Sequence, residues 1–185
     1  LAPQSVLWPM FGRYTQRMRE RAAGIDERPV VADWEEKSIS AEETFDTDIA
    51  DPSRLHAEIV RLADKAVSRL RAKKLTGGCV TVKIRRGDFT TYTRQRQVEP
   101  RTQETRVVAR IAAELLDGWR KTQPQAALRL LGVGVSDLGE EVQADLFGAP
   151  ESTRNRQLDA AVDSVREKFG TVALRPASTI VKPRE

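Results

Sequence analysis

The chain is poor in cysteine and aromatic residues and lacks long apolar runs, and each scarcity excludes a class of protein. Cys79 is the only cysteine among the 185 residues, so a disulfide within the chain is impossible, which favours a reducing, cytosolic setting. Aromatic residues make up 5% of the chain, so the core must be built from leucine, valine, isoleucine and alanine. No apolar run approaches the roughly 18 residues of a membrane-spanning helix, so no membrane partner is expected.

The charge that is present is unevenly distributed. Lysine and arginine number 31, and aspartate and glutamate number 27, which gives a formal net charge of +4. The stretch 80–96 contains five basic residues and one acid, so its surplus equals that of the whole chain. A basic, threonine-rich strand face suits the phosphate backbone of a nucleic acid, and a solvated sheet face is the alternative interpretation.

Periodicity in the same stretch predicts a β-hairpin. Residues 80–85 alternate between apolar and polar side chains, which is the period of a half-buried strand. Gly87-Asp88 predicts a two-residue turn. The polar strand that follows carries Arg94 and Arg96 on one parity.

The pattern around the hairpin predicts an α+β fold. Strands are expected at 37–40, from Cys79 to the hairpin turn, after that turn, and at 128–135. Helices are expected at 52–73 and at 102–119, and Gly77-Gly78 is expected to close the first helix. The order strand, helix, strand, strand, helix, strand predicts a four-stranded antiparallel sheet with two helices on one face. Helical extensions are expected at both ends, the first stopped by Gly24.

Five segments in a fixed order carry a family resemblance. They are Phe11-Gly12 with 24–30, Lys37-Ser38-Ile39-Ser40 with Glu43-Thr44-Phe45, 82–91 with Thr93-Arg94, 129–136, and 157–170. Together they resemble the C-terminal part of a Y-family DNA polymerase of the DinB (polymerase IV) type. The resemblance spans nearly the whole chain.

The resemblance implies a division of the chain. Residues 1–30 would be the end of the thumb and its tether, 31–138 the DNA-binding little finger domain, 139–150 a linker, and 151–185 a C-terminal helix with a tail that is disordered from Arg175. The start without methionine indicates a piece of a longer protein. That parent would be a bacterial, cytoplasmic, nucleoid-associated translesion polymerase. Its partners would be primer–template duplex DNA, the sliding clamp, and its own palm, fingers and thumb.

Strand parity assigns one set of residues to the bare face of the sheet, with Phe89 on the core side. The expected DNA-binding residues are Ser38, Ser40, Thr81, Lys83, Arg85, Arg86, Thr90, Tyr92, Arg94, Arg96, Gly132 and Gly134. Hydroxyl groups and glycines let a DNA backbone come close, and basic side chains meet phosphate oxygens. The expected binding is insensitive to DNA sequence. Arg129 has core parity by strict alternation, so a phosphate contact from it is not expected.

A second site is expected in the linker. Gln143-Ala144-Asp145-Leu146-Phe147 resembles the short peptide with which bacterial polymerases bind the sliding clamp. Gln143 would satisfy polar groups at the rim of a groove, and Leu146 and Phe147 would fill an apolar pocket. The alternative is that these two side chains pack back onto the domain.

No catalytic residue, metal site or cofactor is expected in this chain. The resemblance places polymerase activity, with Mg²⁺ ions held by palm carboxylates, upstream of Leu1, so this chain is expected to be inactive alone. The alternative function is a generic α+β nucleic-acid- or protein-interaction module with no polymerase parent. Tyr92 is the only candidate for stacking on a base, which argues against an RNA-binding sheet.

Overall fold

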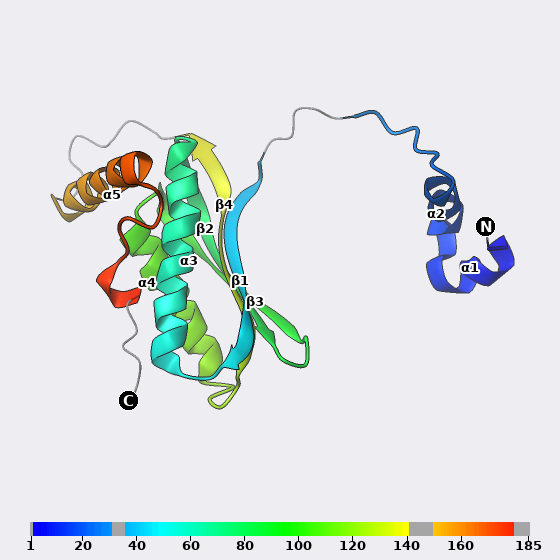
Figure 1. The fold of residues 1–185 in the computed structure, drawn as a ribbon, viewed down its shortest axis with the longest axis horizontal. Helices are drawn as coiled ribbons and strands as arrows, with labels where there is room; N and C mark the ends of the chain where they lie inside the picture. Colours follow the sequence, from blue (N-terminus) through cyan, green and yellow to red (C-terminus); the bar gives the residue numbers. More distant parts are fainter. Residues whose placement is uncertain (1, 31–35, 141–149, 180–185) are drawn as a thin grey trace. The chain divides into compact units, whose positions relative to one another are not determined.

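The computed structural model describes residues 2–30, 36–140 and 150–179 (Figure 1). The chain divides into two compact units, Leu1–Glu35 and Glu36–Glu185, which are described separately. Among the described residues, no helix is both long enough and apolar enough to cross a membrane.

The first unit consists of short helices. Helix α1 spans Gln4–Phe11, the 3-10 helix η1 spans Gly12–Tyr14, and α2 spans Thr15–Ala22. The expected stop at Gly24 is confirmed, because its φ of 77° lies in the left-handed region that glycine adopts freely. The backbone N–H of Ile25 then donates to the carbonyl of Glu20 at 2.8 Å, which closes the helix end.

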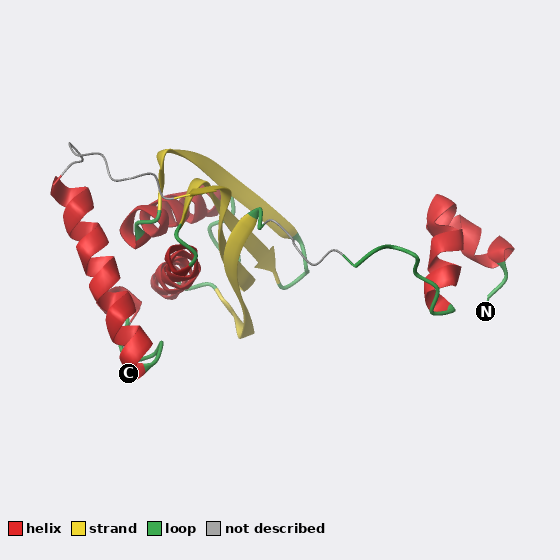
Figure 2. Ribbon diagram, turned by 90° about the horizontal axis from the view of Figure 1, so that it is seen from above, coloured by secondary structure: helices red, strands yellow, loops and turns green. Residues whose placement is uncertain are grey.

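The second unit has the predicted α+β architecture. Its elements are β1 (Ser38–Ile49), α3 (Pro52–Ala72), β2 (Leu75–Arg86), β3 (Thr91–Thr102), α4 (Thr105–Arg120) and β4 (Leu128–Glu140). The four strands form one antiparallel sheet in the order β1-β4-β2-β3. Helix α3 packs on β1 and β4, and α4 packs on β2 and β3, so both helices cover the same face (Figure 2).

Local sequence explains the start of α3 and the position of the core. Asp51 caps the helix, because its Oδ1 accepts hydrogen bonds from the backbone N–H groups of Ser53 at 2.7 Å and Arg54 at 3.3 Å. Pro52 occupies the first turn, where its missing N–H costs nothing. The core between the helices and the sheet is aliphatic, as the composition requires. Its fully buried members include Leu55, Ile59, Leu62, Val80, Val82, Ile84, Leu116 and Leu131, with Trp119 beside them.

Strands β1, β2 and β4 are longer than predicted, and β1 continues to Ile49, beyond the expected strand at 37–40. Strand β2 begins at Leu75, so Gly77 and Gly78 lie within the strand and do not close the helix. Lys74, with a φ of 57°, ends the helical segment in their place. Gly77 is required by packing, since a Cβ there would lie 2.0 Å from Cγ1 of Val135. Strand β4 continues to Glu140, five residues past the expected end, through further pairs with β2.

The C-terminal helix α5 (Pro150–Phe169) forms a further layer on the α3 and α4 side (Figure 2). The helix was expected to be amphipathic with an apolar side, but Leu158 and Phe169 on that side are 63% and 73% exposed. Disorder was expected from Arg175 onward, and the described part of this segment contains one short helix. The 3-10 helix η2 (Ala177–Thr179) packs against α3.

Candidate nucleic-acid interface

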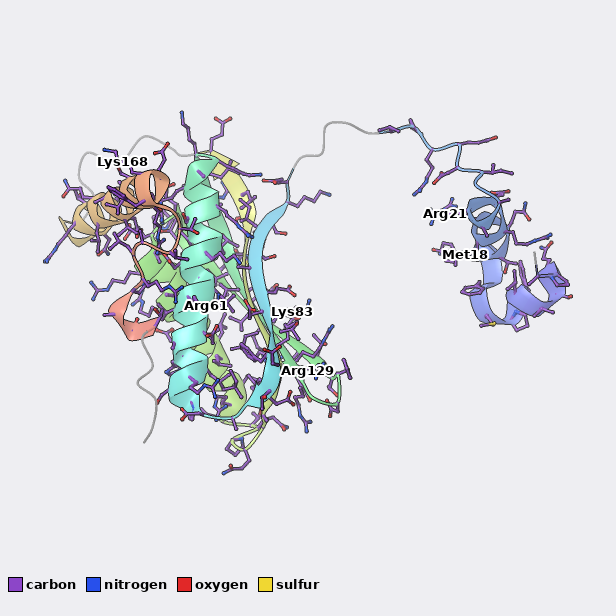
Figure 3. The ribbon with its side chains drawn as sticks, in the orientation of Figure 1. Met18, Arg21, Arg61, Lys83, Arg129 and Lys168 are labelled. Carbon is purple, nitrogen blue, oxygen red and sulfur yellow. The ribbon has the colours of Figure 1, made fainter. Side chains whose placement is uncertain are left out.

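Strand register decides which side chains face the uncovered side of the sheet. In an antiparallel sheet, directly paired residues point to the same face. Val82 and Ile84 are fully buried under the helices, so Thr81, Lys83 and Arg85 between them face the other side. Figure 3 shows Lys83 on the side of the sheet away from α3, the helix that carries Arg61.

The two inner strands and β1 contribute small residues to this face. Gly134 pairs with both Ser40 and Thr81, and Gly132 pairs with Lys83. The register also places Ser38 on this side, since it pairs with Ser136 opposite Cys79. The predicted facing of Ser38, Ser40, Thr81, Lys83, Arg85, Gly132 and Gly134 is therefore confirmed. Together they form a shallow strip of hydroxyls and glycine backbone beside two cations.

The facing predicted for the second hairpin strand was wrong. Tyr92 pairs with Ile84, Arg94 with Val82, and Arg96 with Val80, so all three lie on the helix-covered face of the sheet. Contacts agree with the register: the rings of Tyr92 and Trp119 are 5.4 Å apart, and Arg96 forms an ion pair with Glu114 of α4.

The cause of this error is the length of the hairpin loop. The backbone N–H of Arg86 donates to the carbonyl of Thr90 at 3.0 Å, so three residues, Gly87, Asp88 and Phe89, form the loop where two were expected. One extra residue moves every following side chain to the opposite face. Phe89, which was expected in the core, is 65% exposed at the loop.

Four residues of β3 take the place of the misassigned ones. Lys83 pairs with Thr93 and Arg85 with Thr91, and the same parity continues along the strand. The residues that sequence reasoning missed on the uncovered face are Thr91, Thr93, Gln95 and Gln97. Their hydroxyl and amide groups are uncharged hydrogen-bond partners for phosphate and sugar oxygens. Their facing depends on the third loop residue, Phe89, and no feature of the sequence marks that residue as part of the loop.

The cations of this face are partly balanced by an acid. Nζ of Lys83 lies 2.8 Å from Oε2 of Glu42, which shares the face through its pairing with Gly132. Nε of Arg85 donates to Oγ1 of Thr91 at 2.8 Å, so this guanidinium is held along the sheet by a neutral partner. A side chain on Gly132 would displace Glu42, because its Cβ would lie 2.8 Å from Cγ of that residue.

A β-bulge adds Arg129 to the uncovered side. In β4, Leu130 pairs with Arg85 and Leu128 with Arg86, so Arg129 is an extra residue without a direct partner in β2. Bulges re-aim side chains, and here strict alternation fails. The Arg129 guanidinium carbon lies 5.1 Å from the centre of the Phe89 ring at the hairpin tip, where Figure 3 labels it.

The remaining predicted residues lie at the hairpin end. Arg86 pairs with the fully buried Leu128, so it belongs to the helix side of the strand, and its Nη1 is 3.5 Å from Oδ2 of Asp88. Thr90 follows the loop, and its N–H donates to Oδ1 of Asp88 at 2.9 Å. Hydrogen bonds from Thr90 and the nearby charge of Arg86 lower the pKa of Asp88, so this loop carboxylate stays ionised.

Two other expectations concern sites beyond the sheet. Gln143, Leu146 and Phe147, the predicted clamp-binding residues, lie outside the described residues. Within the described part of the chain, no group of three or more histidine, cysteine, aspartate or glutamate side chains could hold a metal ion, so the residues present do not fit the Mg²⁺ site of a polymerase palm.

Comparison with known proteins identifies the family. The sequence profile described as "impB/mucB/samB family C-terminal domain" matches residues 36–146. The chain belongs to this family. DNA polymerase IV of Streptomyces coelicolor is 47% identical over 133 residues, which cover 72% of this chain and 27% of that protein. DNA polymerase IV of Dehalococcoides mccartyi strain BAV1 is 37% identical over 178 residues, which cover 96% of this chain and 45% of that protein.

These relatives support the predicted assignment of this impB/mucB/samB family member to the C-terminal part of a DinB-type Y-family DNA polymerase. The chain spans less than half the length of either relative. A solved structure titled "Insertion ternary complex of Dbh DNA polymerase" matches with a TM-score of 0.50 at 13% identity, covering 76% of this chain and 40% of that one. That likeness concerns the fold alone.

Proposed function

We propose that this chain is the part of a translesion DNA polymerase that grips primer–template duplex DNA through its uncovered sheet face. The observation that carries the proposal is the strip in which glycines and hydroxyls of β1, β2 and β4 lie beside Lys83, Arg85 and Arg129. The polymerase relatives supply the context, because a chain of this family would act beside a polymerase palm.

The face suits phosphate contacts better than base reading. Gly134, which is partly exposed, adds no bulk, so a DNA backbone can approach the strands closely there, and the threonine and serine hydroxyls can donate to phosphate oxygens. Lys83, Arg85 and Arg129 can add charge-assisted hydrogen bonds. No recognition helix lies on this face in the described residues, so binding would be insensitive to sequence.

Salt dependence tests this proposal. Three cations that meet phosphates would release about three counterions, so log K against log salt concentration is expected to slope by about −2 to −3. The measurement is fluorescence anisotropy of labelled duplexes of two unrelated sequences, titrated with this chain at several salt concentrations. Equal affinities for the two duplexes are also expected. A slope near zero would be incompatible with a phosphate-binding face.

We also propose that Gln143, Leu146 and Phe147 tether the polymerase to a sliding clamp. The support is the sequence itself, in which Gln143 is followed by the adjacent pair Leu146 and Phe147. This peptide comes directly after the last strand, which ends at Glu140, and is followed by Gly148-Ala149-Pro150. Such a peptide can insert an apolar pair into a groove of the clamp while the amide of Gln143 satisfies the rim.

The tether has a direct test. Replacing Leu146 and Phe147 together by alanine is expected to weaken clamp binding at least 100-fold, because the apolar anchors of a short peptide carry most of its affinity. Surface plasmon resonance on an immobilised bacterial sliding clamp measures the loss. Duplex affinity serves as the control and should not change. Undiminished clamp binding by the double variant would refute the tether.

A further inference from the structure

The tip of the β2–β3 hairpin holds an aromatic residue in an unfavourable backbone conformation. Phe89 occupies the last loop position with a φ of 65°, in the left-handed region. Hairpin loops of this length commonly place glycine or asparagine there, because a Cβ clashes with the backbone. A bulky residue at this position is an outlier and indicates that its side chain serves a purpose.

Burial does not compensate for this conformation. The Phe89 side chain is 65% exposed, whereas the aromatic residues that stabilise the domain, such as Trp119, are buried. Figure 1 shows the hairpin tip projecting on the side of the sheet away from α3 and α4. The exposed ring lies at the end of the strip that is proposed to bind phosphates, so it can contact a nucleic acid bound along that strip.

The loop holds the ring in a defined position. The N–H of Phe89 donates to the carbonyl of Arg86 at 3.0 Å, and the N–H of Arg86 donates to the carbonyl of Thr90 at 3.0 Å. Oδ1 of Asp88 accepts from the N–H of Thr90 at 2.9 Å and tightens the turn further. The backbone that carries the Phe89 ring is therefore preorganised, which reduces the entropy lost on binding.

Arg129 contacts one side of the ring. Its guanidinium carbon lies 5.1 Å from the ring centre, a cation–π distance, and the β-bulge in β4 brings it there. Arginine on one face of an aromatic ring leaves the opposite face for a second flat group. Bases in a duplex already stack on one another, so a base available for this contact is an unpaired one.

We propose that Phe89 stacks on an unpaired base of the single strand that extends from the duplex, with Arg129 behind the ring. This inference rests on the proposed function, since the sheet face must hold the duplex next to the tip. The ligand is single-stranded DNA in continuity with a duplex. Stacking on an aromatic ring tolerates every base, so the contact would favour the junction without favouring a sequence.

The test compares a blunt duplex with the same duplex carrying a single-stranded extension that contains 2-aminopurine. Binding is expected to quench the 2-aminopurine fluorescence, and the extension should raise affinity about tenfold, the loss typical when a stacking aromatic is replaced by alanine. Phe89→Ala should remove both effects and leave affinity for the blunt duplex unchanged. Phe89→Trp, which keeps a ring, should retain both.

Phe89→Gly separates stacking from folding. Glycine relieves the backbone strain, so this variant should unfold at a higher temperature than the wild type and still lose the benefit of the extension. Equal losses for blunt and extended DNA in Phe89→Ala, or unchanged quenching in that variant, would overturn the stacking proposal. Failure of the wild type to bind the blunt duplex would instead refute the proposed function, so the two failures are distinguishable.

Discussion

Replacing both Lys83 and Arg85 by glutamate is expected to lower affinity for duplex DNA by about 100-fold or more at moderate salt concentration. The two side chains alternate with buried residues of β2 and face the uncovered side of the sheet. Each loses a phosphate contact and becomes repulsive to phosphate. Lys83→Glu also brings a second carboxylate next to Glu42, which lies 2.8 Å from the native ammonium group.

The matched control changes two arginines of the same hairpin by the same total charge. Arg94 and Arg96 pair with Val82 and Val80, whose side chains are in the core, so the register places them on the helix side. Their replacement by glutamate should lower duplex affinity only several-fold, through the long-range field. The ion pair of Arg96 with Glu114 is about half exposed, so its loss should affect stability little.

Anisotropy titrations of the two double variants, with thermal unfolding to verify that both remain folded, check this prediction. The comparison isolates position from charge, because the net charge of both variants is the same. Similar affinities for the two variants would mean that the field of the whole hairpin, and not the uncovered face, controls binding. A greater loss from Arg94 and Arg96 would assign DNA to the helix-covered edge.

The same hairpin illustrates how far sequence alone could go. Alternation of Val80, Val82 and Ile84 with polar residues correctly predicted the buried and exposed sides of β2, because a strand has a strict period of two. The order of helices and strands likewise predicted the sheet and its covered face. Both depend on hydrophobic periodicity, which sequence records directly.

The facing of β3 could not be predicted, because it depends on the count of loop residues. Gly87-Asp88 is typical of a two-residue turn, and nothing marks Phe89 as a third loop residue, since left-handed positions normally carry glycine or asparagine. Strict alternation placed Arg129 on the core side for a similar reason. A bulge interrupts the alternation, and the position of a bulge depends on how β4 pairs with its two neighbouring strands.

The docking of α5 was also beyond sequence reasoning, because charged side chains carry it. The apolar positions Leu158 and Phe169 are exposed. On α3, Asp64 pairs with Arg166 of α5, and Arg71 pairs with Asp163 of α5. Hydrophobic periodicity assigns an apolar stripe to the inside of a helix, whereas here Val162 and Val165 of that stripe are only partly buried and ion pairs join the helix to α3.

The ion pair between Arg166 and Asp64 should contribute strongly to the stability of this docking. It is bidentate, with Nη1–Oδ1 at 3.0 Å and Nη2–Oδ2 at 2.7 Å, and its side chains are only 10% and 14% exposed. The hydrogen bonds to Asp64 raise the pKa of Arg166 further above its ordinary value, so the guanidinium remains charged at any physiological pH. Arg166 also donates to the carbonyl of Leu174 at 2.8 Å, which ties the segment after the helix to the same site.

Removing one partner of this pair is expected to release α5. Asp64→Leu leaves a largely buried guanidinium without its carboxylate, and Arg166→Leu leaves the carboxylate, so each variant should lose about 2–3 kcal/mol of docking free energy. The double variant, with two leucines in contact, should regain most of that loss, because the desolvation cost of both charges disappears together. The docking free energy of each variant is measured by hydrogen exchange of the α5 amides, relative to exchange of the sheet amides.

Lys168→Leu provides the control, since Lys168 lies exposed in the last turn of the same helix and its substitution should not change exchange. Amides of the four strands should keep their protection in every variant, because the core that holds the sheet does not include this ion pair. Unchanged α5 protection in both single variants would show that other contacts hold the helix. Independent, additive losses in the double variant would show that Asp64 and Arg166 do not act as a pair.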